Sequence, residues 1–282
     1  MEKKVPLFEA QPLTIYNSAT LSPGMNNITF DFGANPENDQ VDQLYDLRES
    51  ELIEKALSPP VPLALFLQQL GVNYPYCWLA LEVDTKRLIK DWNHDKPGDV
   101  DLVSGNIKED RISLDYIVGI QVKLRKVKAP NELRSFPSGT GTEQAHYTAL
   151  MGFDKTMLLH FIIREPQPVP EGFAPSWNPI VNSNFINAAK ACKGAIKERL
   201  EKERELFGYG WIGWGQAYGK KWQVCGGFSD EIILDPPLRP RKDTSDVRKA
   251  RKSLNQSLNN LLSRRVINSA PYIWRPQNGR LT

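Results

Sequence analysis

Two stretches of sequence decide the fold of this 282-residue chain: Asp99-Val-Asp-Leu-Val103 and Tyr116-Ile-Val-Gly-Ile-Gln-Val-Lys-Leu-Arg-Lys-Val127. Both contain β-branched residues, and the second alternates apolar and polar side chains, as a strand with one buried face does. Alternation places Gln121 and Lys123 on the same face of their strand. If the two strands are neighbours, Asp101 lies beside that pair.

Outward from these strands, the pattern predicts an α/β protein with a mixed central sheet. An apolar strand precedes them, and two short helices precede that strand, the second ending at a glycine. After them, a glycine-rich loop leads into a helix, and a nearly continuous apolar run follows, as in a strand buried on both faces. The predicted elements are helices at Asp39–Leu57 and Pro62–Leu70, strands at Tyr76–Thr85, Asp99–Val103 and Tyr116–Val127, a helix from Ser138–Thr142 to Gly152, and a strand at Thr156–Ile163.

The two ends of the chain have a different composition from this core. Residues 1–36 are rich in Pro, Asn, Gly and Thr and predict irregular structure, with a short strand pair near Leu13–Tyr16 and Ile28–Phe32. Residues 166–282 predict a C-terminal extension for recognition, assembly or partner binding, with two helices around a Gly- and aromatic-rich segment. The aromatic side chains of that segment fill a core or a partner interface, or alternatively stack on bases. The three segments are 184–206, 207–228 and 246–267.

Composition bounds the class of protein. Hydrophobic residues make up 40% and charged residues 24%, which is typical of a globular chain, and the formal net charge is only +3. The three cysteines are far apart, which argues against a disulfide framework or a thiolate zinc site. No apolar stretch approaches about 20 residues, the length of a membrane-spanning helix. We therefore expect a protein of the cytoplasm without a membrane partner.

The strand pair predicts a chemistry. A carboxylate at Asp101 and the side-chain carbonyl of Gln121 are hard oxygen ligands suited to Mg²⁺. An ammonium at Lys123 can orient an attacking water or stabilise charge on a phosphate in its transition state. Together these three residues predict metal-assisted hydrolysis of phosphodiester bonds.

At Gly98-Asp-Val-Asp-Leu102 and Gln121-Val-Lys123 the chain resembles the PD-(D/E)xK nuclease superfamily, in its Mrr-like Gln-x-Lys variant. The resemblance implies a restriction-endonuclease-like αβββαβ core over residues 37–165. It also implies an endonuclease that uses Mg²⁺, or Mn²⁺ in its place, to cut DNA, with a role in antiphage defence. It adds Gln144 as a supporting residue and an acid on the first helix, which the sequence leaves open among Glu49, Glu51 and Glu54. Asp99 is a further supporting candidate that replaces the charge missing at Gln121 if its strand is regular, since alternation then places it on the face of Asp101.

Two alternatives remain at this stage. Asp101, Gln121 and Lys123 are also compatible with ordinary polar positions at a sheet edge. A nuclease-like subunit that has lost catalysis and binds a partner protein or nucleic acid is the second alternative, because Gln121 stands where relatives carry a second carboxylate.

Basic residues cluster locally despite the small total charge. One group follows Lys123 on its strand, and the other lies on the C-terminal helix. We expect both to contact nucleic acid, with a regulatory partner protein or self-assembly controlling the activity. The candidate contacts are Arg125, Lys126 and Lys128, and Arg248, Lys249, Arg251 and Lys252.

Overall fold

The structure is a computed structural model that describes residues 29–34, 46–57, 63–89, 99–109, 111–127, 141–164, 207–216, 222–228, 244–262 and 272–274. Its helices are α1 (Glu49–Ala56), α2 (Leu63–Gln69), α3 (Thr85–Leu88), α4 (Thr142–Leu150) and α6 (Ser245–Leu262). Its strands are β1 (Thr29–Ala34), β2 (Cys77–Asp84), β3 (Asp99–Lys108), β4 (Arg111–Val127), β5 (Lys155–Arg164), β6 (Gly208–Gln216), β7 (Trp222–Phe228) and β8 (Tyr272–Trp274).

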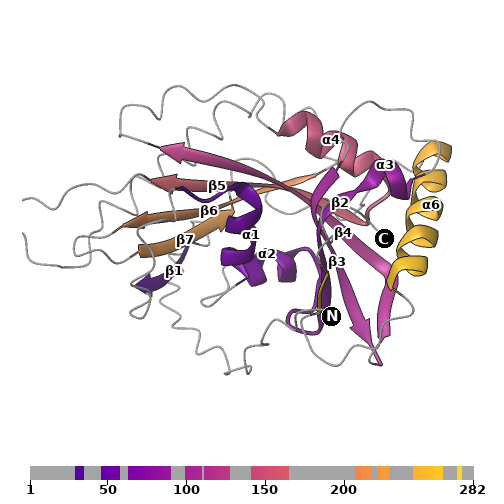
Figure 1. Cartoon of the computed structure of the whole chain (residues 1–282), viewed down its shortest axis with the longest axis horizontal. Helices are drawn as coiled ribbons and strands as arrows, with labels where there is room; N and C mark the ends of the chain where they lie inside the picture. The colour runs from indigo at the N-terminus through magenta and orange to yellow at the C-terminus, as the bar shows by residue number, and fades with distance from the viewer. Residues whose placement is uncertain are drawn as a thin grey trace, which may run out of the picture.

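All described strands belong to one mixed sheet in the order β1-β7-β6-β5-β4-β3-β2-β8. β2, β3 and β4 pair antiparallel, whereas β4, β5 and β6 pair parallel. β7 and β1 extend one edge antiparallel, and β8 adds a parallel strand at the other edge. The predicted mixed α/β class is confirmed, and the predicted core elements occur in the predicted order with the short α3 inserted after β2 (Figure 1).

The predicted bounds differ from the structure by more than two residues at three elements. β3 and β4 are longer than expected because they continue into a hairpin that pairs Lys108 with Arg111. Within the described residues, the first helix begins at Glu49, because Arg48 has extended backbone angles and forms a capping box with Glu51. The expected helical residues 39–45 lie outside the described residues, as do Leu13–Tyr16 and the helix expected at 184–206.

The described parts of both chain ends add strands to the central sheet. β1 supports the strand expected near Ile28–Phe32, and its partner is β7. The Gly- and aromatic-rich segment forms β6 and β7, and its aromatic residues Tyr209, Trp211 and Trp214 are at most 5% exposed. These three side chains therefore fill the core, and base stacking by them was the wrong alternative.

Helices cover both faces of the sheet. Leu52, Phe66, Leu102 and Phe161 belong to a cluster that joins α1 and α2 to one face. Other buried residues join α3 and α6 to the opposite face, including Trp78, Val103, Leu254 and Leu258. Figure 1 shows α1 and α2 together in front of the sheet and α6 apart from them. None of the described helices is long and apolar enough to cross a membrane.

Candidate active site

The paired ends of β3 and β4 carry the predicted site residues. Leu102 pairs with Ile120, so the same register places Asp101 opposite Gln121. The alternation of β3 is broken at Asp101, because Val100 and Leu102 belong to buried clusters on opposite faces of the sheet, and Glu82 on the neighbouring strand has a φ of +51°. Gln121 and Lys123 share one face of β4, whereas the expected shared face of Asp99 and Asp101 required a regular strand that β3 does not have here.

Asp101 is a partly buried carboxylate whose surroundings disfavour its ionised form. Its Oδ2 accepts a hydrogen bond of 2.6 Å from the backbone N–H of Val122. The pKa of Asp101 is raised to about 7, mainly by burial and to a smaller extent by the nearby Glu49 and Asp99 carboxylates, whereas Lys123 and the Val122 hydrogen bond act to lower it. Burial, with two neighbouring carboxylates, thus disfavours the ionised form of Asp101 more than Lys123 and the Val122 N–H favour it.

Glu49 is the helix acid that the structure brings to this site. Its Oε2 accepts a hydrogen bond of 2.7 Å from Leu124 N–H, and its Oε1 lies 3.6 Å from the ammonium of Lys123. Glu51 instead pairs with Arg48, and the side chain of Glu54 is exposed. The sequence places all three acids on one helix, but the rotation of that helix against β4 decides which one reaches the strand end.

Lys123 is held between two elements. Its side chain is 21% exposed, and its ammonium lies beside Glu49 on one side. On the other side, the start of α4 packs against its aliphatic stem, since a Cβ added to Gly141 would lie 2.7 Å from Lys123 Cγ. Gly141 has a φ of +81°, which glycine adopts at little cost. The ammonium is consequently directed to the end of the site where Asp101 and Glu49 lie.

Gln121 is buried, and its amide group is fixed by two hydrogen bonds. Nε2 donates to the backbone carbonyl of Asp99 at 2.9 Å and to Oγ1 of Thr148 on α4 at 3.0 Å. Thr148 was absent from the sequence-predicted site. A signal for it existed, because Thr148 follows Gln144 by four residues and therefore lies on the same side of the predicted helix.

The two supporting residues contribute through different groups. The Asp99 side chain is exposed, its carboxylate raises the pKa of Asp101, and its backbone carbonyl holds Gln121. Gln144 accepts the Thr148 hydroxyl through its backbone carbonyl at 2.8 Å, and its side chain is partly exposed. A direct role of either side chain in catalysis stays a prediction.

The donor set is chemically suited to a hard cation. Glu49 and Asp101 supply carboxylate oxygens, and Gln121 supplies an amide oxygen, which are the ligand types that Mg²⁺ prefers. A divalent cation would also stabilise the ionised form of Asp101, whose pKa is raised by burial and by the neighbouring carboxylates. Among the described residues, no group of three or more His, Cys, Asp or Glu side chains has a metal-binding arrangement. The donor set at β3 and β4 instead combines two carboxylates with one amide.

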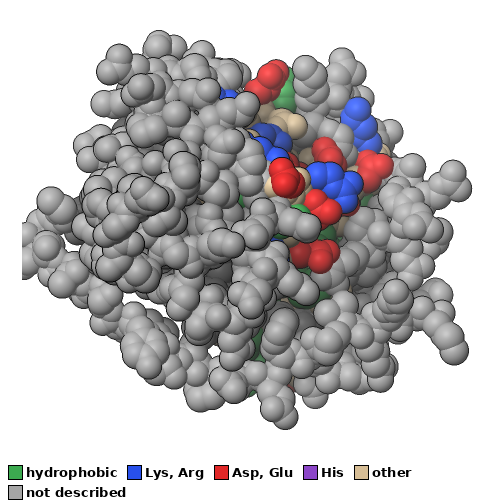
Figure 2. All heavy atoms as spheres, turned by 60° about the vertical axis from the view of Figure 1, so that its left-hand side comes forward, with side chains coloured by type: hydrophobic (Ala, Val, Ile, Leu, Met, Phe, Trp, Pro, Cys, Tyr) green, Lys and Arg blue, Asp and Glu red, His purple; other side chains and the backbone are tan. Residues whose placement is uncertain are grey.

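The expected nucleic-acid contacts lie in two places. Arg125 is partly exposed and Lys126 exposed near the end of β4, whereas Lys128 lies outside the described residues. The exposed side of α6 carries Arg248, Lys249 and Lys252. On the face in Figure 2, basic and acidic side chains of the described part lie interleaved. Binding of nucleic acid by these residues stays a prediction.

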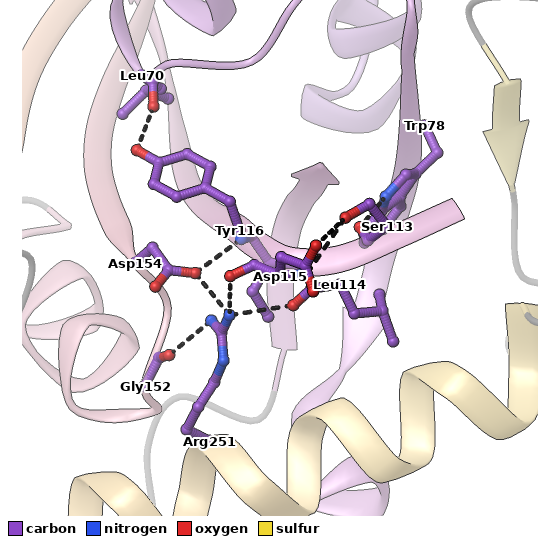
Figure 3. A network of polar contacts seen from close by, with 10 residues as sticks. Leu70, Trp78, Ser113, Leu114, Asp115, Tyr116, Gly152, Asp154 and Arg251 are labelled. Carbon is purple, nitrogen blue, oxygen red and sulfur yellow. Dashed lines mark hydrogen bonds and ion pairs between the residues drawn. The ribbon is translucent and has the colours of Figure 1, made fainter. Parts of the chain in front are cut away.

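Arg251 was also expected to contact nucleic acid, but it has an internal role. Its guanidinium lies 2.6 Å from the Asp154 carboxylate, and its side chain is only 11% exposed. It also donates to the backbone carbonyls of Gly152, Leu114 and Asp115 (Figure 3). Basic residues at successive positions of a helix point in different directions, and Arg251 is the one on the side of α6 that faces the sheet.

Comparison with known proteins gives little further information. No protein-family model and no curated protein matches the sequence. Among solved structures, SfsA from Pyrococcus furiosus in complex with Ca²⁺ is similar to 62% of this chain over 58% of its own length, at 13% sequence identity and a TM-score of 0.23. A TM-score this low supports no argument about fold or function.

Proposed function

We propose that this chain is a metal-dependent nuclease with a restriction-endonuclease-like core, which hydrolyses phosphodiester bonds of DNA. One observation carries the proposal: Glu49 and Asp101, two carboxylates from different elements, lie around Lys123 at the ends of β3 and β4. The oriented amide of Gln121 adds a neutral oxygen ligand at the same place. This combination of groups suits phosphoryl chemistry better than a purely structural ion pair, which needs one partner of each sign.

Each residue has a defined role in the proposal. Asp101, Glu49 and Gln121 Oε1 would hold Mg²⁺ or Mn²⁺, which when bound supplies charge stabilisation and lowers the pKa of a coordinated water. Lys123 stabilises the negative charge that develops on the scissile phosphate, or orients the attacking water. Glu49 keeps the ammonium of Lys123 in place before the substrate binds.

The test is cleavage of a supercoiled plasmid with Mg²⁺ or Mn²⁺ by wild type, Asp101→Asn and Lys123→Met. Matched controls are Asp115→Asn and Lys108→Met, because Asp115 and Lys108 form an exposed ion pair on the β3–β4 hairpin. We expect both site variants to lose at least a hundredfold in rate and both controls to keep wild-type rates. Cleavage that survives both site substitutions would refute the mechanism.

The alternative, a nuclease-like subunit that only binds, is favoured by one feature of the site. Gln121 contributes no negative charge, so the donor set has one charge fewer than a set with three carboxylates. Tight binding of DNA without cleavage under Mg²⁺ and Mn²⁺ would support this alternative. A role in antiphage defence and control by a partner protein or self-assembly remain predictions from the resemblance.

A further inference from the structure

The side-chain amide of Gln121 is buried, and its nitrogen is held by two hydrogen bonds within the protein. Gln121 is 1% exposed and Thr148 is 0% exposed, so water does not replace their contacts. Both hydrogens of Nε2 have a protein acceptor, the Asp99 carbonyl and the Thr148 oxygen. Burial of this kind makes each of these hydrogen bonds costly to lose.

The two acceptors determine which end of the amide is which. A backbone carbonyl can only accept a hydrogen bond, so it must face the nitrogen of Gln121. The Thr148 hydroxyl donates its own hydrogen to the Gln144 carbonyl at 2.8 Å, so its oxygen can only accept from Gln121. A flipped amide would set its oxygen against two acceptors, and this arrangement is excluded.

The orientation has a consequence for metal binding. Of the two polar atoms of a carboxamide, the oxygen binds a hard cation and the NH₂ group does not. With Nε2 bound to Asp99 and Thr148, the oxygen is the atom left to face a cation. A carboxylate at position 121 would place an oxygen against the Asp99 carbonyl, so the pocket is built for an amide.

We infer that Thr148 is a positioning residue: its hydroxyl, anchored on the Gln144 carbonyl, fixes the amide of Gln121 so that its oxygen serves as the metal ligand. The inference rests on the proposed function and adds α4 to the site as a structural support. The same helix packs on the Lys123 stem through Gly141. One helix thus holds two of the site side chains in place.

The experiment measures Mn²⁺ binding by calorimetry with the full-length wild type, Thr148→Val and Thr148→Ser. Valine keeps the shape of threonine and removes the hydroxyl, whereas serine keeps the hydroxyl. We expect valine to weaken Mn²⁺ binding about tenfold, as for other groups that orient metal ligands, and serine to stay within about twofold of wild type. Thr148→Ala serves as a second hydroxyl-free variant, and thermal unfolding verifies that each protein is folded.

A second readout follows the amide directly. In the NMR spectrum, the Gln121 side-chain amide protons of wild type and Thr148→Ser should exchange slowly with solvent, and those of Thr148→Val faster. Gln121→Glu should bind Mn²⁺ no more tightly than wild type, although it adds a negative charge.

The outcomes separate the two proposals. A wild type that binds no Mn²⁺ contradicts the proposed function and this inference with it. If folded Thr148→Val binds Mn²⁺ as tightly as wild type, the role of Thr148 is contradicted while the proposed function stands. Tighter Mn²⁺ binding by Gln121→Glu than by wild type also contradicts only the role of Thr148.

Discussion

Two clusters of charged residues lie against the central sheet, and they differ in how completely their charges are compensated. At one, Arg251 on α6 pairs with Asp154 at 2.6 Å and donates to three backbone carbonyls, while Asp154 also accepts from Ile117 N–H at 2.8 Å. At the other, Asp101 accepts a hydrogen bond from Val122 N–H and lies near Glu49 and Lys123. The first cluster is one cation and one anion with good geometry, and the second has an excess of negative charge.

The difference separates a charge pair that stabilises the fold from a charge cluster that is suited to binding a cation. A buried ion pair whose hydrogen-bonding groups are satisfied joins elements that are far apart in sequence, here α6, β4 and the turn after α4 (Figure 3). A carboxylate whose pKa is raised to about 7 by burial and like charges is destabilised by its own environment. Such an arrangement is useful where a ligand supplies the missing positive charge.

The largest expected effect is at the satisfied cluster. Arg251→Met removes the guanidinium and leaves Asp154 buried without its cation, so the free energy of unfolding should fall by about 3–5 kcal/mol. Urea denaturation followed by circular dichroism measures this change. The matched control is Lys249→Met on the same helix, whose exposed pair with Asp246 at 3.9 Å should contribute less than about 0.5 kcal/mol. Equal losses in the two variants would contradict the structural role of Arg251.

The next effect concerns the two glycines at the ends of α4. A Cβ at Gly152 would lie 2.7–2.9 Å from Arg251 Cβ and from the backbone of α6, which cannot move away. A Cβ at Gly141 would meet side-chain atoms of Lys123 and Leu158. Both glycines have a positive φ, so both alanine variants lose stability through strain.

We therefore expect Gly152→Ala to cost about 3 kcal/mol and Gly141→Ala about 1–2 kcal/mol. Gly141→Ala should nevertheless be the variant that lowers plasmid cleavage, because it displaces Lys123. A larger loss of stability in Gly141→Ala than in Gly152→Ala, measured by urea denaturation, would contradict the close packing of α6 on the turn at Gly152.

A smaller effect, of opposite sign, is expected at the under-compensated cluster. The Asp101 carboxyl loses its proton near pH 3.8 in the unfolded chain and near pH 7 in the folded protein. The folded state therefore binds more protons between these values, and the free energy of unfolding falls as the pH rises from about 4 to about 7. The penalty is absent below about pH 4 and complete above about pH 7.

Asp101→Asn removes this penalty and keeps an acceptor for Val122 N–H. Relative to wild type, the free energy of unfolding of Asp101→Asn should increase by about 2 kcal/mol more at pH 8 than at pH 5. Urea titrations at the two pH values measure the difference, with Asp115→Asn as the exposed control. If Asp101→Asn had the same free energy of unfolding as wild type at both pH values, the ionised Asp101 would not destabilise the folded protein.

The sequence predicted the neighbouring strands that carry Asp101, Gln121 and Lys123 and the alternation that places Gln121 and Lys123 on one face, because a period of two is a local property. It left Glu49 open among three acids, since helix rotation is set by packing against β4 rather than by spacing. Arg251 was misassigned for a related reason: a run of basic residues does not reveal which member faces the core. Thr148 was missed because its partner, Gln121, is 27 residues away and the contact forms only when α4 packs on the sheet.

The most direct test of the metal site is the number of protons released when Mn²⁺ binds, measured by calorimetry in buffers of different ionisation enthalpy. Because metal and proton compete for Asp101, wild type should release about one proton per ion at pH 6 and almost none at pH 8.5. Asp101→Asn should bind Mn²⁺ more weakly and lose this pH dependence. The absence of Mn²⁺ binding at both pH values, or an affinity and proton release unchanged in Asp101→Asn, would contradict the proposed site.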